Sequence, residues 1–171
     1  MLIRPLTEED LDALWSIRLR SLQENPEAFG STVDETLQRG KKSLRQRLRQ
    51  PHAATCFLGA FADEQDEQLV GIVAYVRESG TKGQHKGYIV SMYVTREQRG
   101  RGIGAALLAE AIALAREAPG LDQLLLAVVT VNTAARQLYH SLGFEVYGLE
   151  PRALKQGDQY WDEELMILRL H

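Results

Sequence analysis

Cysteine is almost absent from this sequence, which contains only Cys56 and therefore cannot form an internal disulfide. That scarcity favours a reducing compartment, so we expect a cytoplasmic protein. Long apolar runs are also missing, and none approaches the ~20 residues of a membrane-spanning helix. The acidic start MLIRPLTEEDL lacks the apolar segment of a signal peptide. We therefore expect no membrane partner.

An excess of positive charge is missing as well. Lys and Arg number 20 against 23 Asp and Glu, and the net charge of −3 argues against a broad basic face for nucleic acid. The cysteine and four histidines show no metal-ligand spacing, so no metal site is predicted. No serine or cysteine nucleophile is recognisable. Repeats, low-complexity tracts and linkers are absent, and 171 residues suit a single α/β or α+β domain over residues 1–171.

Hydrophobic periodicity and turn residues divide the chain into alternating elements. Strands are predicted over residues 2–6, 55–62, 68–79, 88–94, 124–129, 144–150 and 161–170. The second and third form a hairpin across the acidic turn at residues 63–67. The run 124–129, LLLAVV, is apolar throughout, which is typical of a central strand covered on both faces.

Four helices are predicted between these strands. The first follows Thr7, an N-cap residue, and its apolar face includes Trp15 and Arg18, with Trp15 expected in the core. The second covers residues 35–49 and is ended by Pro51. The third follows a glycine-rich stretch, and the fourth is capped by Asn132 and ends near residue 143.

The glycine-rich stretch QRGRGIGAALLAEAIALA, which begins at Gln98, is the most informative part of the sequence. Glycine costs a helix about 1 kcal/mol relative to alanine, yet three glycines and two arginines stand where this helix begins. Unpaired N–H groups and the helix dipole attract phosphate, and glycines let the main chain approach it closely. This pattern favours phosphate binding. The alternative is that Gly102 and Gly104 only allow close packing of the helix on the sheet.

The residues after the glycines narrow the kind of phosphate ligand. No Gly-Lys-Ser/Thr appears, which excludes a Walker loop. The run GRGIGA, residues 100–105, matches the dinucleotide pattern G-x-G-x-x-A. That pattern needs an acid about 20 residues later, after the next strand, and Asp122 precedes its strand. Because the glycines match the pattern but the acid does not, a dinucleotide-dependent oxidoreductase is kept only as a minor alternative.

Two motifs, in order and separated by about the length of one βαβ repeat, resemble those of the GNAT superfamily of N-acetyltransferases. Residues 99–104, RGRGIG, are similar to that family's R/Q-x-x-G-x-G/A motif. Residues 132–144, NTAARQLYHSLGF, resemble its second motif, and MYVTREQRG resembles the strand that enters the glycine loop. The similarity is strongest over residues 88–147, and the order of elements fits the whole chain.

This resemblance implies a fold and a set of site residues. The fold is α/β (α+β), a GNAT-like domain with a mixed sheet of about seven strands splayed in its middle and about four helices. Acetyl-CoA, the implied cosubstrate, occupies the cleft. The backbone of Met92 and Val94 would bind the pantetheine amides, Asn132 would lie along the cofactor and Tyr139 near its sulfur. The pyrophosphate would be held by the amides of Arg99, Gly100, Arg101, Gly102, Ile103 and Gly104.

The resemblance implies that Tyr139 is the general acid, and the chemistry permits this role. An amine attacks the thioester and a thiolate leaves, and a thiol has a pKa of about 8.5 against about 10 for a phenol. A tyrosine can protonate that thiolate if its pKa is lowered or if proton transfer is coupled to departure, an effect worth about 10²–10⁴-fold. The alternatives are structural: Tyr139 as a partly buried packing residue, and Asn132 as a plain N-cap.

The general base is harder to assign. The position where many relatives carry glutamate holds Tyr88, and a phenol is not a base at neutral pH. We favour proton loss through water, with Ser91 able to hold a water molecule. His85 is the alternative, because histidine titrates near neutrality, and Asp162 and Glu163 are further candidates. Tyr88 is also the best support for a third interpretation, a non-catalytic acyl-CoA-binding module.

The acceptor is expected to enter beside the segments NPEAFGSTVDE and EPRALKQGDQYWDE. Phe29, Tyr160 and Trp161 are candidates for an aromatic wall. Candidate acids to attract an ammonium group are Glu27, Asp34, Glu35, Glu150 and Asp158. The acceptor can be a small amine, an amino acid, a polyamine or a protein N-terminus. The sequence also leaves open whether the protein forms a homodimer and whether it transfers acyl groups other than acetyl.

Overall fold

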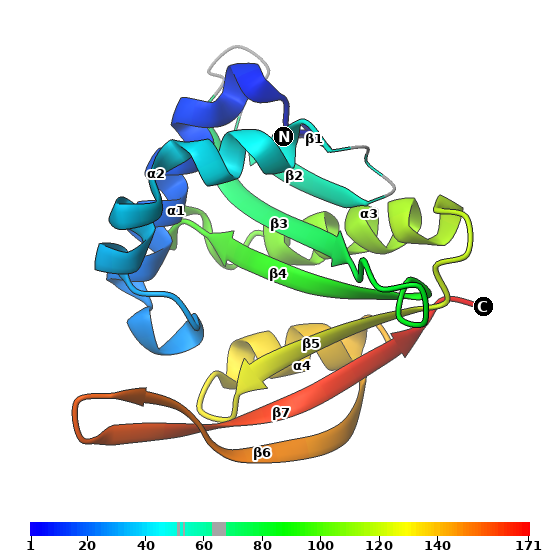
Figure 1. The fold of residues 1–171 in the computed structure, drawn as a ribbon. Helices are drawn as coiled ribbons and strands as arrows, with labels where there is room; N and C mark the ends of the chain where they lie inside the picture. Colours follow the sequence, from blue (N-terminus) through cyan, green and yellow to red (C-terminus); the bar gives the residue numbers. More distant parts are fainter. Residues whose placement is uncertain (51, 53, 63–67) are drawn as a thin grey trace.

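The computed structural model describes residues 1–50, 52, 54–62 and 68–171, and these form one seven-stranded sheet beside four helices (Figure 1). The strand order is β1-β2-β3-β4-β5-β7-β6. Neighbouring strands are antiparallel except β4 and β5, so the predicted mixed sheet is confirmed. The bounds are β1 Leu2–Pro5, β2 Thr55–Phe61, β3 Leu69–Arg77, β4 Lys86–Val94, β5 Gln123–Val129, β6 Glu145–Gln156 and β7 Gln159–Arg169.

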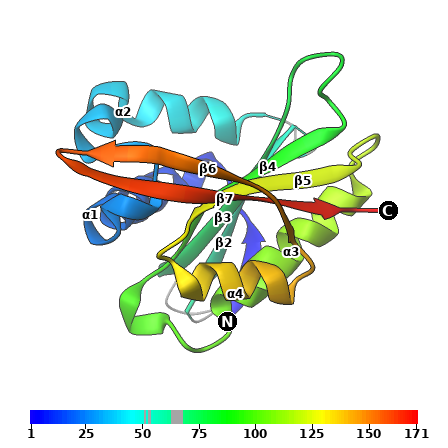
Figure 2. The same cartoon turned by 90° about the horizontal axis from the view of Figure 1, so that it is seen from below.

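The four helices cover both faces of the sheet, as the views in Figures 1 and 2 show. Alternation along β3 explains the two layers, because neighbouring strand residues point to opposite faces. Ile72 belongs to a buried cluster that includes residues of α1 (Leu11–Glu24) and has residues of α2 (Val33–Leu48) packed against it. Val73 belongs to a second cluster, which includes residues of α3 (Ile103–Glu117) and α4 (Thr133–Ser141). The predicted number of helices is confirmed.

The sheet opens between β4 and β5. The two strands pair in parallel only from Lys86 to Tyr88, opposite residues 123–125, and then diverge (Figure 1). A bulge in β4 lies just beyond: Val90 pairs with Ala74 and Tyr93 with Ile72, so two residues of β4 stand opposite one of β3. Ser91, inside the bulge, has a φ of 57°. Among the described residues, the edge of β4 beyond Tyr88 therefore pairs with no strand, and the predicted splay is confirmed.

The two C-terminal strands are longer than predicted. Residues 151–160, which lay between the two predicted strands, form the outer half of the hairpin, whose register resumes from Leu154–Trp161 to Gln156–Gln159. Gly157, with a φ of 58°, permits the tight turn. Pro151 is tolerated because β6 is an edge strand and the proline falls in a register shift. Figure 2 shows this hairpin reaching toward α1 and α2.

The N-terminal helices also differ from expectation in detail. Thr7 and Asp10 form a capping box, but it opens a 3-10 turn and α1 begins only at Leu11. Ile17 takes the core position on α1, and Trp15 is only half-buried, which corrects its expected place in the core. The turn at 63–67 and Pro51 lie outside the described residues. Within the described part of the chain, no helix is long and apolar enough to cross a membrane.

Candidate active site

The glycine loop before α3 holds its backbone in a conformation that favours glycine. Gly100 and Gly102 have φ values of 76° and 77°, in the left-handed region that other L-residues rarely adopt. A Cβ atom built at either position would have no heavy atom within 4 Å. Open space therefore lies in front of both glycines, as a bound group would require.

Unpaired backbone donors face the same space. The first hydrogen bond of α3 runs from the N–H of Ala106 to the Gly102 carbonyl, at 3.0 Å. No acceptor for the N–H groups of residues 100–105 is found in the described part of the chain. N–H groups without an acceptor, together with the helix dipole, are the features that attract an anion.

Gly104 serves packing as well. A Cβ atom there would lie 3.1 Å from Cε of Met92 and 3.4 Å from Cδ2 of Leu138. The glycine thus lets α3 approach β4 and α4 closely. Of the two alternatives raised by the sequence, close packing therefore applies to Gly104, whereas no packing contact restricts a side chain at Gly102.

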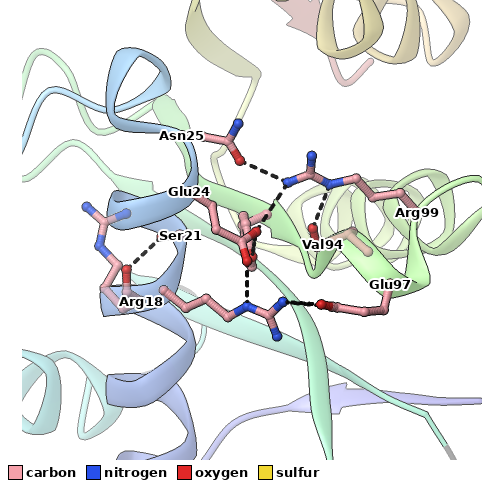
Figure 3. Close-up of polar contacts among 9 residues, drawn as sticks. Arg18, Ser21, Glu24, Asn25, Val94, Glu97 and Arg99 are labelled. Carbon is pink, nitrogen blue, oxygen red and sulfur yellow. Dashed lines mark hydrogen bonds and ion pairs between the residues drawn. The ribbon is translucent and has the colours of Figure 1, made fainter.

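The Arg99 side chain ties the glycine loop to the end of α1 (Figure 3). Its Nε donates to the Val94 carbonyl at 3.0 Å, and its Nη2 donates to Oδ1 of Asn25 at 2.9 Å. The same Nη2 lies 3.9 Å from Oε2 of Glu24. Its guanidinium is therefore engaged with protein groups and positions the loop, and one lone pair of the Val94 carbonyl is already taken.

Glu24 is the centre of the network seen in Figure 3. It accepts from the Tyr93 hydroxyl at 2.6 Å and from Nε of Arg20 at 2.8 Å, and both bonds lower the pKa of Glu24. Burial and then the hydrogen bond to Glu24 raise the pKa of Tyr93 to about 12. Arg20 also pairs with Glu97, at 2.7 Å. These bonds fix the turn that leads into the glycine loop.

A first cavity of about 380 Å³, here called the cofactor cavity, lies in front of this loop. Its lining includes nearly all the predicted cofactor-binding residues: Met92, Val94, Arg99, Gly100, Gly102, Ile103, Gly104 and Asn132. Arg101 is exposed and does not line it. Asn132 caps α4, its Oδ1 accepting from the Ala135 N–H at 3.2 Å. The N-termini of both α3 and α4 therefore border this cavity.

A second cavity of about 540 Å³, here called the acceptor cavity, adjoins the first. The two share Ala28, Phe29 and Met92 among their lining residues. Tyr139 and Glu163 line the acceptor cavity, as do Tyr88 and Ser91. The opening of the sheet thus brings together groups from β4, α4 and β7 around the second cavity.

Tyr139 is buried, with 7% of its surface exposed, and its ring meets that of Phe144 edge-on at 5.9 Å between centroids. No hydrogen bond to its hydroxyl occurs among the described residues. Burial raises the pKa of Tyr139 to about 12. The phenol therefore stays protonated at any physiological pH. The lowered pKa that would help Tyr139 to release a proton is not found.

Two neighbouring acids on β7 differ in their environment. Asp162 is engaged, since its Oδ1 accepts from the Arg152 N–H at 2.7 Å and holds the β6 bulge. Glu163 lines the acceptor cavity and stands opposite Glu150 in the β6–β7 register. Burial first, and Glu150 second, raise the pKa of Glu163. His85 precedes β4 and lines neither cavity.

The predicted acceptor-side residues separate into two groups. Phe29, Trp161, Glu27 and Asp34 line a third cavity, of about 330 Å³, between the 3-10 turn after α1 and the β6–β7 hairpin. The others do not line it. Tyr160 is covered by Arg152, with Cζ 3.7 Å from the ring centroid. Glu35 belongs to the capping box of α2, Glu150 faces Glu163, and Asp158 lies in the hairpin turn.

Sequence reasoning missed Arg18 and Arg47 as candidate site residues. Both line the acceptor cavity. Arg18 stands on the apolar face of α1, and a charged residue in an apolar stripe was the available signal. Arg47 sits in the basic helix α2, where nothing distinguished it from its neighbours.

Comparison with known proteins identifies the family of this chain. The family model described as "Acetyltransferase (GNAT) family" matches residues 14–144. Mycothiol acetyltransferase of Thermobispora bispora is 32% identical over 138 residues, which cover 79% of this chain and 43% of that protein. This chain thus spans less than half the length of that relative.

Two solved structures share the fold. A GNAT-family acetyltransferase from Streptococcus pneumoniae superposes with a TM-score of 0.84 and 25% identity, covering 98% of both chains. A GNAT-superfamily phosphinothricin acetyltransferase from Sinorhizobium meliloti, in complex with acetyl-CoA, has a TM-score of 0.81 and 21% identity, over 98% of this chain and 87% of that one.

Proposed function

The chain belongs to the GNAT family of acetyltransferases, and from that premise we propose that it transfers the acetyl group of acetyl-CoA directly to a primary amine. One observation carries the proposal. The cavity at the N-termini of α3 and α4 adjoins, at Phe29 and Met92, a second cavity lined by Tyr139 and Glu163. This arrangement suits a phosphorylated carrier on one side and an acceptor on the other.

The residues of the cofactor cavity suit the parts of CoA. The N–H groups of residues 100–105, which have no acceptor in the described part of the chain, suit the pyrophosphate. The unpaired edge of β4, with Met92 and Val94, suits the pantetheine amides, which would add to it as a strand does. Asn132 would lie along the carrier while it caps α4. When bound, acetyl-CoA supplies the activated thioester carbonyl.

Two side chains of the acceptor cavity each carry out one of the two proton transfers. Glu163 takes the proton that the amine loses, directly or through one water molecule. The amine nitrogen forms the new bond to the carbonyl carbon, the C–S bond breaks, and Tyr139 gives its proton to the departing sulfur. Solvent then takes the proton from Glu163 and returns one to the Tyr139 phenolate, which restores both groups. A base with a raised pKa is closer to its working pH, which favours Glu163 over the water route. By this scheme no metal is needed. The single cysteine is the basis on which we also propose a cytoplasmic location.

Acetyl transfer is tested with a panel of amines scored by release of free thiol from acetyl-CoA. We expect release with at least one primary amine and stabilisation of the protein by CoA but not by NAD(P). A ligand at 100 times its Kd adds about 2.7 kcal/mol of stability. Stabilisation by CoA without turnover of any amine would instead indicate a non-catalytic binding module. Stabilisation by NAD(P) alone would contradict the proposal entirely.

Removal of the Tyr139 hydroxyl tests the proposed acid. We expect Tyr139→Phe to lower kcat by about 10–10³-fold, because a general acid is lost while the ring and its contact with Phe144 are kept. CoA affinity should not change. Steady-state kinetics and calorimetry measure the two quantities, and Tyr160→Phe, which removes an exposed hydroxyl outside both cavities, is the matched control. Wild-type turnover in Tyr139→Phe would leave Tyr139 with a packing role only.

A further inference from the structure

Arg18 lines the acceptor cavity and holds a buried donor that has no partner among the described residues. Its Nη1 is buried and has no hydrogen-bond partner, and it is the one side-chain nitrogen or oxygen in this state among the described residues. Its guanidinium carbon lies 4.9 Å from the centroid of the Phe29 ring, a contact that orients the group but accepts no hydrogen bond. A buried charged donor without an acceptor is costly, so its retention here calls for a ligand.

A small basic pocket continues from that wall. It has a volume of about 100 Å³, lies between α1 and α2, and shares Arg18, Ser31, Arg47 and Ser91 with the acceptor cavity. The lining of the pocket contains three arginines and several hydroxyl groups, and no carboxylate: Trp15, Arg18, Ser31, Thr36, Arg39, Gly40, Ser43, Leu44, Arg47 and Ser91. The pocket lining therefore presents positive charge and hydroxyl groups, and no negatively charged side chain.

Charged side chains are distributed unevenly between the acceptor cavity and the basic pocket. Glu163 is the single acid in the lining of the acceptor cavity, and neither Glu163 nor Tyr139 lines the basic pocket. Arg18 and Arg47 are close enough that the charge of Arg47, after burial, lowers the pKa of Arg18. Two guanidinium groups that repel one another are stabilised by an anion between them.

We propose that the acceptor is a primary amine that also carries a carboxylate, and that Arg18 and Arg47 bind this carboxylate while the amine faces Glu163 and Tyr139. The inference rests on the proposed acetyl transfer and specifies its substrate class. A planar guanidinium binds a carboxylate through two parallel hydrogen bonds, and the pocket is small enough for a group of that size. Polyamines are disfavoured, because their second cation would meet the arginines.

Matched pairs of acceptors provide the test. Each pair consists of an α- or ω-amino acid and its carboxamide, which lacks the negative charge, and spermidine is added as a polyamine. We expect wild-type kcat/KM for the best acid to exceed that of its amide by at least 10-fold, the range for a charge-assisted hydrogen bond. In Arg18→Met, which keeps the packing on Phe29, that ratio should fall to about 1–3 through a higher KM.

Comparing the acid-to-amide ratio of kcat/KM between the wild type and Arg18→Met removes the effect of amine basicity. An amide and its acid differ in amine pKa, but this difference is identical for both enzymes and cancels in the comparison. Arg47→Gln is the second variant, should Arg18→Met fail to fold. Arg45→Gln is the matched control, since Arg45 lies on the same helix and lines neither the acceptor cavity nor the basic pocket. It should keep the wild-type ratio. An aminophosphonate arm tests the choice of carboxylate, and preference for the phosphonate would overturn it.

A binding measurement separates this inference from the proposed function. Calorimetry of the same pairs against the CoA-loaded protein reads the carboxylate site without turnover. Acid binding that Arg18→Met abolishes, with no acetylation, would support the site and reject acetyl transfer. Acetylation of amide and acid at equal efficiency, or spermidine as the best acceptor, would overturn the inference and leave acetyl transfer intact. Absence of both binding and turnover for every acid would also overturn it.

Discussion

Gly102→Asp is expected to lower the affinity for CoA by about 10²–10³-fold. The new carboxylate would stand in the open space before α3, where the N–H groups of residues 100–105 have no acceptor among the described residues. Two unit charges 4 Å apart repel by about 4 kcal/mol at the effective dielectric of a protein surface. The carboxylate would also accept the hydrogen bonds that a phosphate needs. Isothermal titration calorimetry with CoA measures the loss.

Gly102→Asn is the matched control. Asparagine has the shape of aspartate and shares its tolerance of the left-handed region, so backbone strain from a φ of 77° is nearly equal in both variants. Asparagine lacks the charge, and we expect it to weaken CoA binding about 10-fold at most. Pantetheine has no pyrophosphate, so the Gly102→Asp and Gly102→Asn variants should bind it with similar affinity. Equal CoA affinity in folded Asp and Asn variants would mean that the pyrophosphate lies elsewhere.

The parts of the site that were predictable are those set by local backbone chemistry. Glycines at the start of an apolar helix are costly, and Gly100 and Gly102 do adopt the conformation that requires them. Asn132 does accept from the N–H three residues later, as an N-cap does. Such features depend on a few consecutive residues. The splay of the sheet was not derivable in this way and came from the family resemblance.

The features that sequence reasoning missed depend on distant partners. The outer half of the β6–β7 hairpin contains Pro151 and Gly157, which are typical of loops, and only pairing across the hairpin makes it a strand. Trp15 has the periodicity of a core residue, yet it lines the basic pocket between α1 and α2. Arg18 can be recognised as a candidate site residue only when α1, α2 and β4 are brought together around one cavity. Tertiary context, which local patterns do not contain, decides each of these.

The raised pKa of Glu163 has a consequence for stability that separates it from an ordinary surface acid. Its pKa in the folded protein lies above the ordinary value of 4.5, because burial and Glu150 disfavour the charged form. Folding therefore favours protonation. The contribution of this group to stability is fully present below pH 4.5 and is lost as pH rises through the raised pKa. Glu163→Gln, which is always neutral, should be at least as stable as the wild type at pH 7.

The same substitution is expected to reduce activity strongly. Glu163→Gln should lower kcat/KM at pH 7 by about 10²–10⁴-fold, the usual contribution of a general base. CoA affinity should be unchanged, because Glu163 lines the acceptor cavity and not the cofactor cavity. Loss of activity together with equal or higher thermal stability would exclude unfolding as the cause. Full activity in Glu163→Gln would return the proton transfer to water.

The pH profile decides between the routes for the proton. If Glu163 is the base, kcat/KM should rise with pH through a limb at the same pH for two amines of different pKa. That limb should disappear in Glu163→Gln and move to lower pH in Glu150→Gln, because the second cause of the raised pKa is removed. If water carries the proton, log kcat/KM should rise at unit slope up to the pKa of each amine, and the two profiles should differ. An amine-independent limb that survives in Glu163→Gln would reject both routes. Its loss in His85→Gln would then move the base to the turn before β4, although His85 lines neither cavity.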